Sequence, residues 1–161
     1  MKLLLTTAAL MFTVAAYATP KVGDTSEFAL TMTQSGQTRV GSFLTSIVSE
    51  AGDQMTVATT VHFDGQPDQH QEESRAKADL LTDEKINDAL ANCVQYGGAL
   101  EALVVPAGTY PTCKLPSFDD AHKQNGSFWI GAVAFGIVKE EQTTADGTSY
   151  SLVLKTTKNG Q

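Results

Sequence analysis

The sequence predicts an α+β domain in which a curved antiparallel sheet wraps around one main helix. Segments with the alternating pattern of strands recur between turn-forming residue pairs, and one central segment has the period of an amphipathic helix. Because strands precede and follow that helix, an antiparallel sheet must cover its apolar stripe. The length of 161 residues, with 42% apolar and 18% charged residues, fits one domain and excludes a multidomain enzyme.

The strands are predicted from alternation and from the turns between them. Residues 27–32 and 55–63 alternate apolar and polar side chains, so each has one buried face. The clearest hairpin joins residues 134–142 to a strand around Tyr150 through a tight Asp-Gly turn. The polar residues 65–77 are predicted to form a long loop or a mobile edge. The predicted turn pairs are Ser35-Gly36, Gly52-Asp53, Asp64-Gly65, Asn125-Gly126 and Asp146-Gly147.

One helix is predicted over residues 82–96. Thr82 can cap its N-terminus, and the acidic Asp83 and Glu84 stand in the first turn, where they interact favourably with the helix dipole. Gly97-Gly98 is the predicted end. The apolar stripe consists of Ile86, Ala89, Leu90 and Cys93.

The N-terminal residues have the pattern of a secretion signal. Lys2 precedes an apolar stretch, and Ala16-Tyr17-Ala18 has the small-residue spacing that signal peptidases cut. We therefore expect a signal peptide at residues 1–18, cleavage after Ala18, and one β-rich envelope domain over residues 19–161. The leader is bacterial in style, which predicts a periplasmic or secreted protein. An uncleaved anchor is the alternative, but about 14 apolar residues are short of the roughly 20 that span a bilayer.

Two cysteines remain after cleavage, Cys93 and Cys113. In an oxidising compartment unpaired thiols tend to pair, so the sequence predicts one intramolecular disulfide that fastens the helix to the sheet. A catalytic cysteine or a metal site is the alternative. Neither cysteine lies in a C-x-x-C pair, and no metal-ligand spacing surrounds them.

The excess of acidic residues limits which partners the protein can bind. Without Lys2 the chain has 10 basic and 18 acidic residues, a net charge of −8. Such a chain repels phosphate backbones and anionic lipid headgroups, which argues against nucleic acid as a partner. The same acidity suits an inhibitor or immunity-type protein that binds a basic secreted enzyme.

Motifs in the C-terminal part of the chain follow a distinctive order. Residues 105–110 read Val-Pro-Ala-Gly-Thr-Tyr, and residues 133–139 read Val-Ala-Phe-Gly-Ile-Val-Lys after a Phe-Trp-Ile segment at 128–130. Over about the last 60 residues, this order resembles a signature of bacterial envelope proteins of the DUF3108-like and LolA-like kind. The resemblance implies a half-open β-barrel wrapped around helix and an envelope location, and it assigns no catalytic residue. Ala134 stands where that signature has proline, so a softer bend is expected there.

The titratable residues predict no catalytic or metal site. The sequence has no G-x-S-x-G, H-E-x-x-H, Walker or G-x-G-x-x-G motif, and it points to no cofactor. Neighbouring carboxylates such as Glu140 and Glu141 face opposite sides of a strand and are expected in hydrated surface. A hydrolase whose site combines His62, His70 or His122 with nearby carboxylates is an alternative.

Aromatic residues concentrate in the C-terminal strands, namely Phe128, Trp129, Phe135 and Tyr150. They are the candidate ligand-binding residues, because the inner face of an open barrel either fills with side chains or leaves room for an apolar guest. An ordinary packed core is the alternative. The leading hypothesis is an exported, non-catalytic periplasmic protein that binds an apolar ligand, such as a lipid, or a protein partner.

Overall fold

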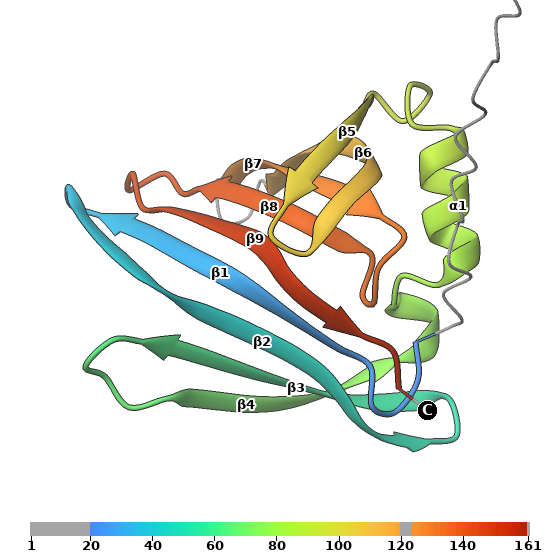
Figure 1. Cartoon of the computed structure of the whole chain (residues 1–161), viewed down its shortest axis with the longest axis horizontal. Helices are drawn as coiled ribbons and strands as arrows, with labels where there is room; N and C mark the ends of the chain where they lie inside the picture. The colour runs from blue at the N-terminus through green and yellow to red at the C-terminus, as the bar shows by residue number, and fades with distance from the viewer. Residues whose placement is uncertain (1–19, 120–123, 161) are drawn as a thin grey trace, which may run out of the picture.

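The computed structural model describes residues 20–119 and 124–160 (Figure 1). The predicted signal peptide and His122 lie outside these residues. The described part holds the 3₁₀ helix η1 (Lys77–Asp79) and the α-helix α1 (Asp83–Ala91). Its strands are β1 (Thr25–Gln34), β2 (Gln37–Ala51), β3 (Gln54–Phe63), β4 (Gln69–Ala76), β5 (Ala99–Val105), β6 (Gly108–Asp119), β7 (Gln124–Gly131), β8 (Ile137–Thr143) and β9 (Ser149–Lys158).

All the described strands form one antiparallel sheet in the order β4-β3-β2-β1-β9-β8-β7-β6-β5. Each half is a meander of neighbouring strands, and the halves meet where β1 pairs with β9, from Thr25 opposite Lys158 onwards. The sheet is open, with β4 and β5 as its edges. An antiparallel sheet accompanied by one α-helix confirms the predicted α+β class.

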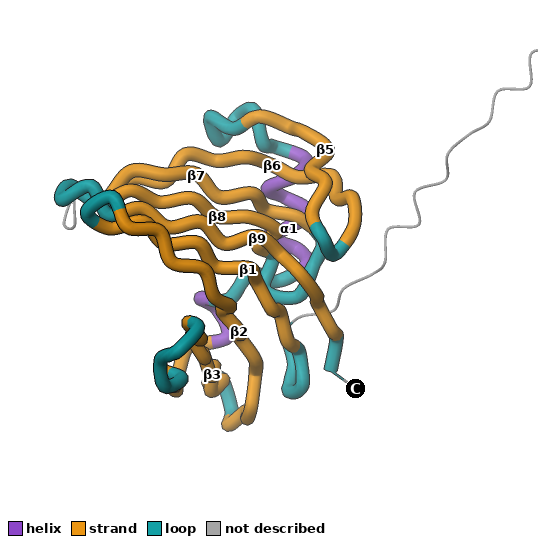
Figure 2. The backbone as a smooth tube through the Cα atoms, turned by 60° about the vertical axis from the view of Figure 1, so that its left-hand side comes forward, coloured by secondary structure: helices purple, strands orange, loops and turns teal. Residues whose placement is uncertain are grey.

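The sheet is curved (Figure 2). The turn between β5 and β6 bends back toward β9, although three strands separate β5 from β9 in the sheet order. There the Ala107 amide donates to the Leu154 carbonyl oxygen at 3.4 Å. Val105 and Leu154 belong to the same buried cluster, and Tyr110 packs against it. This curvature encloses apolar side chains that a flat sheet would expose.

Strand register defines the two faces of the sheet. Phe28 pairs with Phe43 on β2 and with Leu154 on β9, while Leu152 pairs with Glu140 on β8. Glu140 in turn pairs with Phe128, which packs against α1, so all these side chains share what we call the helix face. Trp129 follows Phe128 and points to the opposite face.

The helix begins where the sequence predicts it and ends earlier. The Thr82 hydroxyl accepts a bond from the Lys85 amide, and Ile86, Ala89 and Cys93 are buried, as expected from the stripe. Regular helix stops at Ala91 rather than at residue 96.

Turns replace the last part of the predicted helix. They close with Gly98 donating to the Cys93 carbonyl and Gly97 donating to the Val94 carbonyl. This is the Schellman pattern, and Gly97 supplies its positive φ of 77°. The predicted Gly97-Gly98 end is therefore present, but five residues of turn (92–96) separate it from the last residue of the helix.

Three other expectations about local structure are wrong. Asn125-Gly126 is not a turn but part of β7, where Gly126 lets the neighbouring strand β8 approach closely. The strand predicted from residue 134 begins at Ile137, because Phe135 and Gly136 have positive φ. The bend at Ala134 is tight rather than soft, because the Gly136 amide donates a hydrogen bond to the Val133 carbonyl oxygen at 2.8 Å.

The polar segment at residues 65–77 is mostly strand rather than loop. Within it β4 pairs with β3 along its whole length, from Gln69 opposite Val61 to Ala76 opposite Gln54. Its side chains are almost all exposed, which suits a strand at the edge of the sheet.

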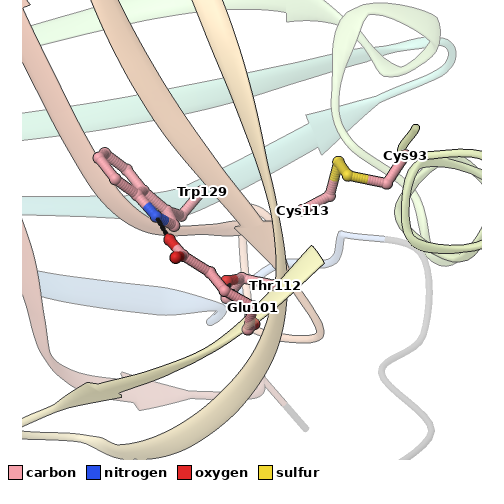
Figure 3. Close-up of a disulfide and its surroundings, with 5 residues drawn as sticks. All are labelled: Cys93, Glu101, Thr112, Cys113 and Trp129. Atoms are coloured by element: carbon pink, nitrogen blue, oxygen red, sulfur yellow. Dashed lines mark hydrogen bonds between the residues drawn. A yellow bond between two sulfur atoms is a disulfide. The ribbon is translucent and has the colours of Figure 1, made fainter. Parts of the chain in front are cut away.

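The predicted disulfide is confirmed. Cys93 and Cys113 are bonded, with their Cα atoms 5.6 Å apart, and both are fully buried (Figure 3). Cys113 lies on β6 opposite Ile130 of β7, and Ile130 packs against α1. The bond therefore joins the segment after α1 to the strand beside which the helix lies.

Candidate functional site: an apolar cavity on the helix face

A cavity of about 310 Å³ lies between the helix face of the sheet and the segment from η1 to the start of α1. Its apolar lining includes Phe28, Phe43, Val57, Leu80, Phe135 and Leu152. Four of these come from β1, β2, β3 and β9, where alternation and register place them on one face. The cavity therefore depends on the pairing of β1 with β9.

The loop between β7 and β8 supplies one wall. Phe135 lines the cavity from this loop with a φ of 65°, a conformation that side-chain-bearing residues rarely adopt. The loop is fixed from the sheet, because the buried Ser26 hydroxyl donates to the Ala134 carbonyl at 2.9 Å. Gly136 packs closely on the chain before α1, where an added Cβ would lie 2.9 Å from Leu81 Cδ1. Backbone constraints thus orient Phe135 toward the cavity.

One carboxylate stands within the apolar lining. Glu140 lines the cavity, and its Oε1 accepts a bond from the Tyr150 hydroxyl at 2.8 Å. The Gln142 amide donates to the same oxygen at 3.5 Å. Burial, and then the bond to Glu140, raise the pKa of Tyr150, so the phenol remains a hydrogen-bond donor at neutral pH.

The opposite side of the cavity carries exposed charged side chains. Arg75 of β4 lines the cavity, and its Nη2 pairs with Glu73 at 2.9 Å. Asp79 of η1 lines the same side. The described lining therefore holds one basic and two acidic side chains, and the basic one already has an acidic partner.

The four aromatic residues predicted from the sequence do not form one site. Phe135 lines the cavity. Tyr150 does not line it but donates a hydrogen bond to Glu140, which does. Phe128 packs instead in the cluster beneath α1. Trp129 faces the other side of the sheet.

Trp129 is held in a polar cage on the opposite face. It is buried, and its indole nitrogen donates to Glu101 (Figure 3). The amino groups of Lys114 and Lys139 lie 4.8 and 4.6 Å from the ring centre. Both lysines flank Trp129 in the strand register, so the ring stacks between cations across β6, β7 and β8.

The histidines lie elsewhere. His62 Nδ1 is 2.7 Å from Asp68 and His70 Nε2 is 3.4 Å from Glu72, and all these groups are exposed. The bond to Asp68 raises the pKa of His62. Neither histidine lines the cavity, and the described residues contain no cluster suited to a metal ion.

Sequence reasoning missed several residues of the cavity. Glu140 was expected in hydrated surface together with Glu141, although neighbours on a strand face opposite sides and one of them must face inward. That alternation was the available signal. Phe28, Phe43 and Leu152 could not be joined from the sequence, because only the pairing of distant strands brings them together.

Comparisons with protein-family models and with curated proteins find no match. Among solved structures, a protein described as exported, with a YmcC-like fold, from Bacteroides fragilis NCTC 9343 has a TM-score of 0.52 at 13% identity, covering 89% of this chain and 99% of that one. A chain in the Pseudomonas aeruginosa MucA/MucB complex has a TM-score of 0.41 at 11% identity, covering 86% of this chain and 53% of that one. A structure of MucB in complex with MucA(peri) has a TM-score of 0.44 at 9% identity, covering 86% and 51%.

The likeness to the Bacteroides protein extends over nearly the full length of both chains and identifies a shared fold. This chain spans about half the length of the two chains matched in the MucA and MucB structures. Within the described residues, every helix is too short or too polar to cross a membrane.

Proposed function

We propose that this chain is an exported, non-catalytic binding protein that holds an apolar ligand in the cavity on the helix face. The observation that carries the proposal is the cavity itself. Its volume of about 310 Å³ lies at the lower end of the range of small-molecule sites, and apolar side chains dominate its lining. A ligand with an apolar body would transfer that surface from water to Phe28, Phe43 and Leu152.

Several observations support export. Residues 1–18 have the pattern of a signal peptide cleaved after Ala18, and the single disulfide fits an oxidising compartment. The Bacteroides structure of the same fold is described as exported. We therefore propose a periplasmic location, one mature domain over residues 19–161, and a half-open barrel of the LolA-like kind. Mass spectrometry of the protein recovered from a bacterial periplasm would show a mature chain that begins at Thr19.

The binding test compares two neighbouring residues of β3. Thr59 lines the cavity, whereas Thr60 points to the opposite face, where it pairs with His70. Thr59→Phe places a ring in the cavity, and Thr60→Phe places the same ring outside it. With the uncharged fluorescent dye N-phenyl-1-naphthylamine as probe, we expect Thr59→Phe to lower affinity by about tenfold and Thr60→Phe to leave it unchanged.

Two results would contradict the proposal. One is the absence of saturable dye binding by the wild-type protein, together with release of no apolar ligand from periplasmic protein in native mass spectrometry. The other is an equal loss of dye binding in Thr59→Phe and Thr60→Phe. Thermal denaturation of both variants verifies that they fold.

A further inference from the structure

We infer that the ligand of this cavity is an amphiphile whose polar end is a cationic amine that pairs with Glu140. The inference rests on the proposed function, because it names the chemistry of the ligand that the cavity holds. Three observations carry it: the position of Glu140, the carboxylate oxygen of Glu140 that accepts no hydrogen bond from a described residue, and the charge of the cavity lining.

Glu140 stands in an apolar row of the helix face. Its neighbours in register are Phe128 on β7 and Leu152 on β9, and both pack in apolar clusters. A carboxylate in such surroundings has lost part of its hydration, which costs free energy unless a cation or hydrogen-bond donors compensate. The sequence nevertheless places a charged residue here.

The carboxylate is only partly satisfied by the protein. The Tyr150 hydroxyl and the Gln142 amide both donate to Oε1, and no described residue donates to Oε2. Within the described residues, no basic side chain forms an ion pair with Glu140. The nearest lysine along the chain, Lys139, points to the other face and pairs with Glu141 at 2.6 Å.

The other charges of the lining favour a cation as well. Arg75, the basic side chain of the lining, is bound through both Nε and Nη2 to Glu73, so its charge is largely neutralised. Asp79 adds a further negative charge. An anionic headgroup would meet repulsion from Glu140 and Asp79, whereas an ammonium group donates to the free oxygen of Glu140 and balances its charge.

The test uses three linear probes that share one alkyl chain and differ in the polar end: dodecylamine, dodecanol and dodecanoate. Each probe is titrated below its micelle concentration against the dye complex at neutral pH. Wild-type protein should bind dodecylamine more tightly than dodecanol, and dodecanoate most weakly. In Glu140→Gln the affinity for dodecylamine should fall by about tenfold with little change for dodecanol. Glu141→Gln, on the opposite face of the same strand, is the matched control and should retain wild-type selectivity.

The outcomes separate this inference from the proposed function. If dodecanol binds but dodecylamine binds no better, or if dodecanoate binds most tightly, the cavity holds apolar ligands but the inference that the ligand has a cationic polar end is wrong. If the dye binds but none of the three probes displaces it, the inference of an amphiphilic amine fails and the proposed function stands. If the dye itself does not bind, the proposed function fails. Should Glu140→Gln not fold, the ranking of the three probes on wild-type protein still decides the inference.

Discussion

Gly126 illustrates how one small residue allows a close contact inside the sheet. It lies in register between Ser117 on β6 and Gln142 on β8. The side chain of Gln142 is buried and crosses over Gly126, so that its amide donates to the Ser117 hydroxyl at 3.0 Å. An added Cβ at Gly126 would lie 2.5 Å from Gln142 Oε1 and 2.0 Å from the Glu141 carbonyl oxygen.

We therefore expect Gly126→Ala to destabilise the protein by about 1–3 kcal/mol, because the methyl group displaces Gln142 and strains β7. Equilibrium unfolding in urea measures the change. Gly52→Asn is the control: Gly52 sits in an open turn with a φ of 59°, nothing lies within 4 Å of its added Cβ, and asparagine tolerates that conformation. Equal unfolding midpoints for Gly126→Ala and the wild type would contradict the close-contact explanation.

At the scale of elements, α1 cannot be stable alone. It has nine residues, and isolated helices shorter than about 12 residues are marginal in water. Its cap at Thr82, the burial of Ile86 and Ala89 against β6 and β7, and the disulfide from Cys93 to Cys113 together hold it on the sheet.

Removing the disulfide tests how much of this attachment is covalent. The bond closes a loop with a sequence separation of 20 residues. In the chain-entropy model, Cys93→Ala with Cys113→Ala should lower the free energy of unfolding by about 3 kcal/mol. Chemical denaturation of the double variant and of the reduced wild-type protein should give similar values. An oxidised protein no more stable than either would show that packing alone holds the helix.

Elements whose signals are local could be predicted from the sequence. Four of the five expected turn pairs fall between strands, and the cap of α1 is where Thr82 indicated it. The turn predicted at Asn125-Gly126 is wrong because Gly126 has another role. Inside β7 its lack of a side chain leaves room for the side chain of Gln142 to cross the strand. Residues 133–136 misled because the positive φ of Phe135 is imposed by the packing around the loop rather than by the residue type.

The candidate site could be predicted only in part. Phe135 was named for ligand binding from its place in an aromatic-rich region, and it does line the cavity. Phe128 and Trp129 are consecutive on a strand and so cannot share a face, which the sequence already implied. The rest of the cavity is assembled by long-range register, for which a single sequence has no signal.

At the scale of the whole molecule, the two edges of the sheet differ in character. β4 is polar, with a histidine, two glutamates and an arginine among its side chains. β5 is mostly apolar, and Leu100 and Val104 are 58% and 76% exposed. Charged residues on an edge strand discourage pairing with other chains, and β5 has only Glu101, which is bound to Trp129.

We expect β5 to be the edge through which the protein aggregates. Val104→Lys should raise the concentration at which the protein remains monomeric and slow the growth of light scattering on mild heating. Val40→Lys is the matched control, since Val40 is 60% exposed but lies on β2, inside the sheet. If the two variants aggregate at the same rate, exposed apolar area rather than the free edge governs association.

The pairing of β1 with β9 also determines when the chain can fold. The strand nearest the C-terminus lies in the middle of the sheet, so the two meanders cannot be joined by strand pairing until β9 has been synthesised. Bringing together partners so far apart in the chain closes a very large loop, which slows folding. Until β9 is present, β1 and β8 each keep an unpaired edge, so no segment of the chain that lacks β9 can complete this sheet.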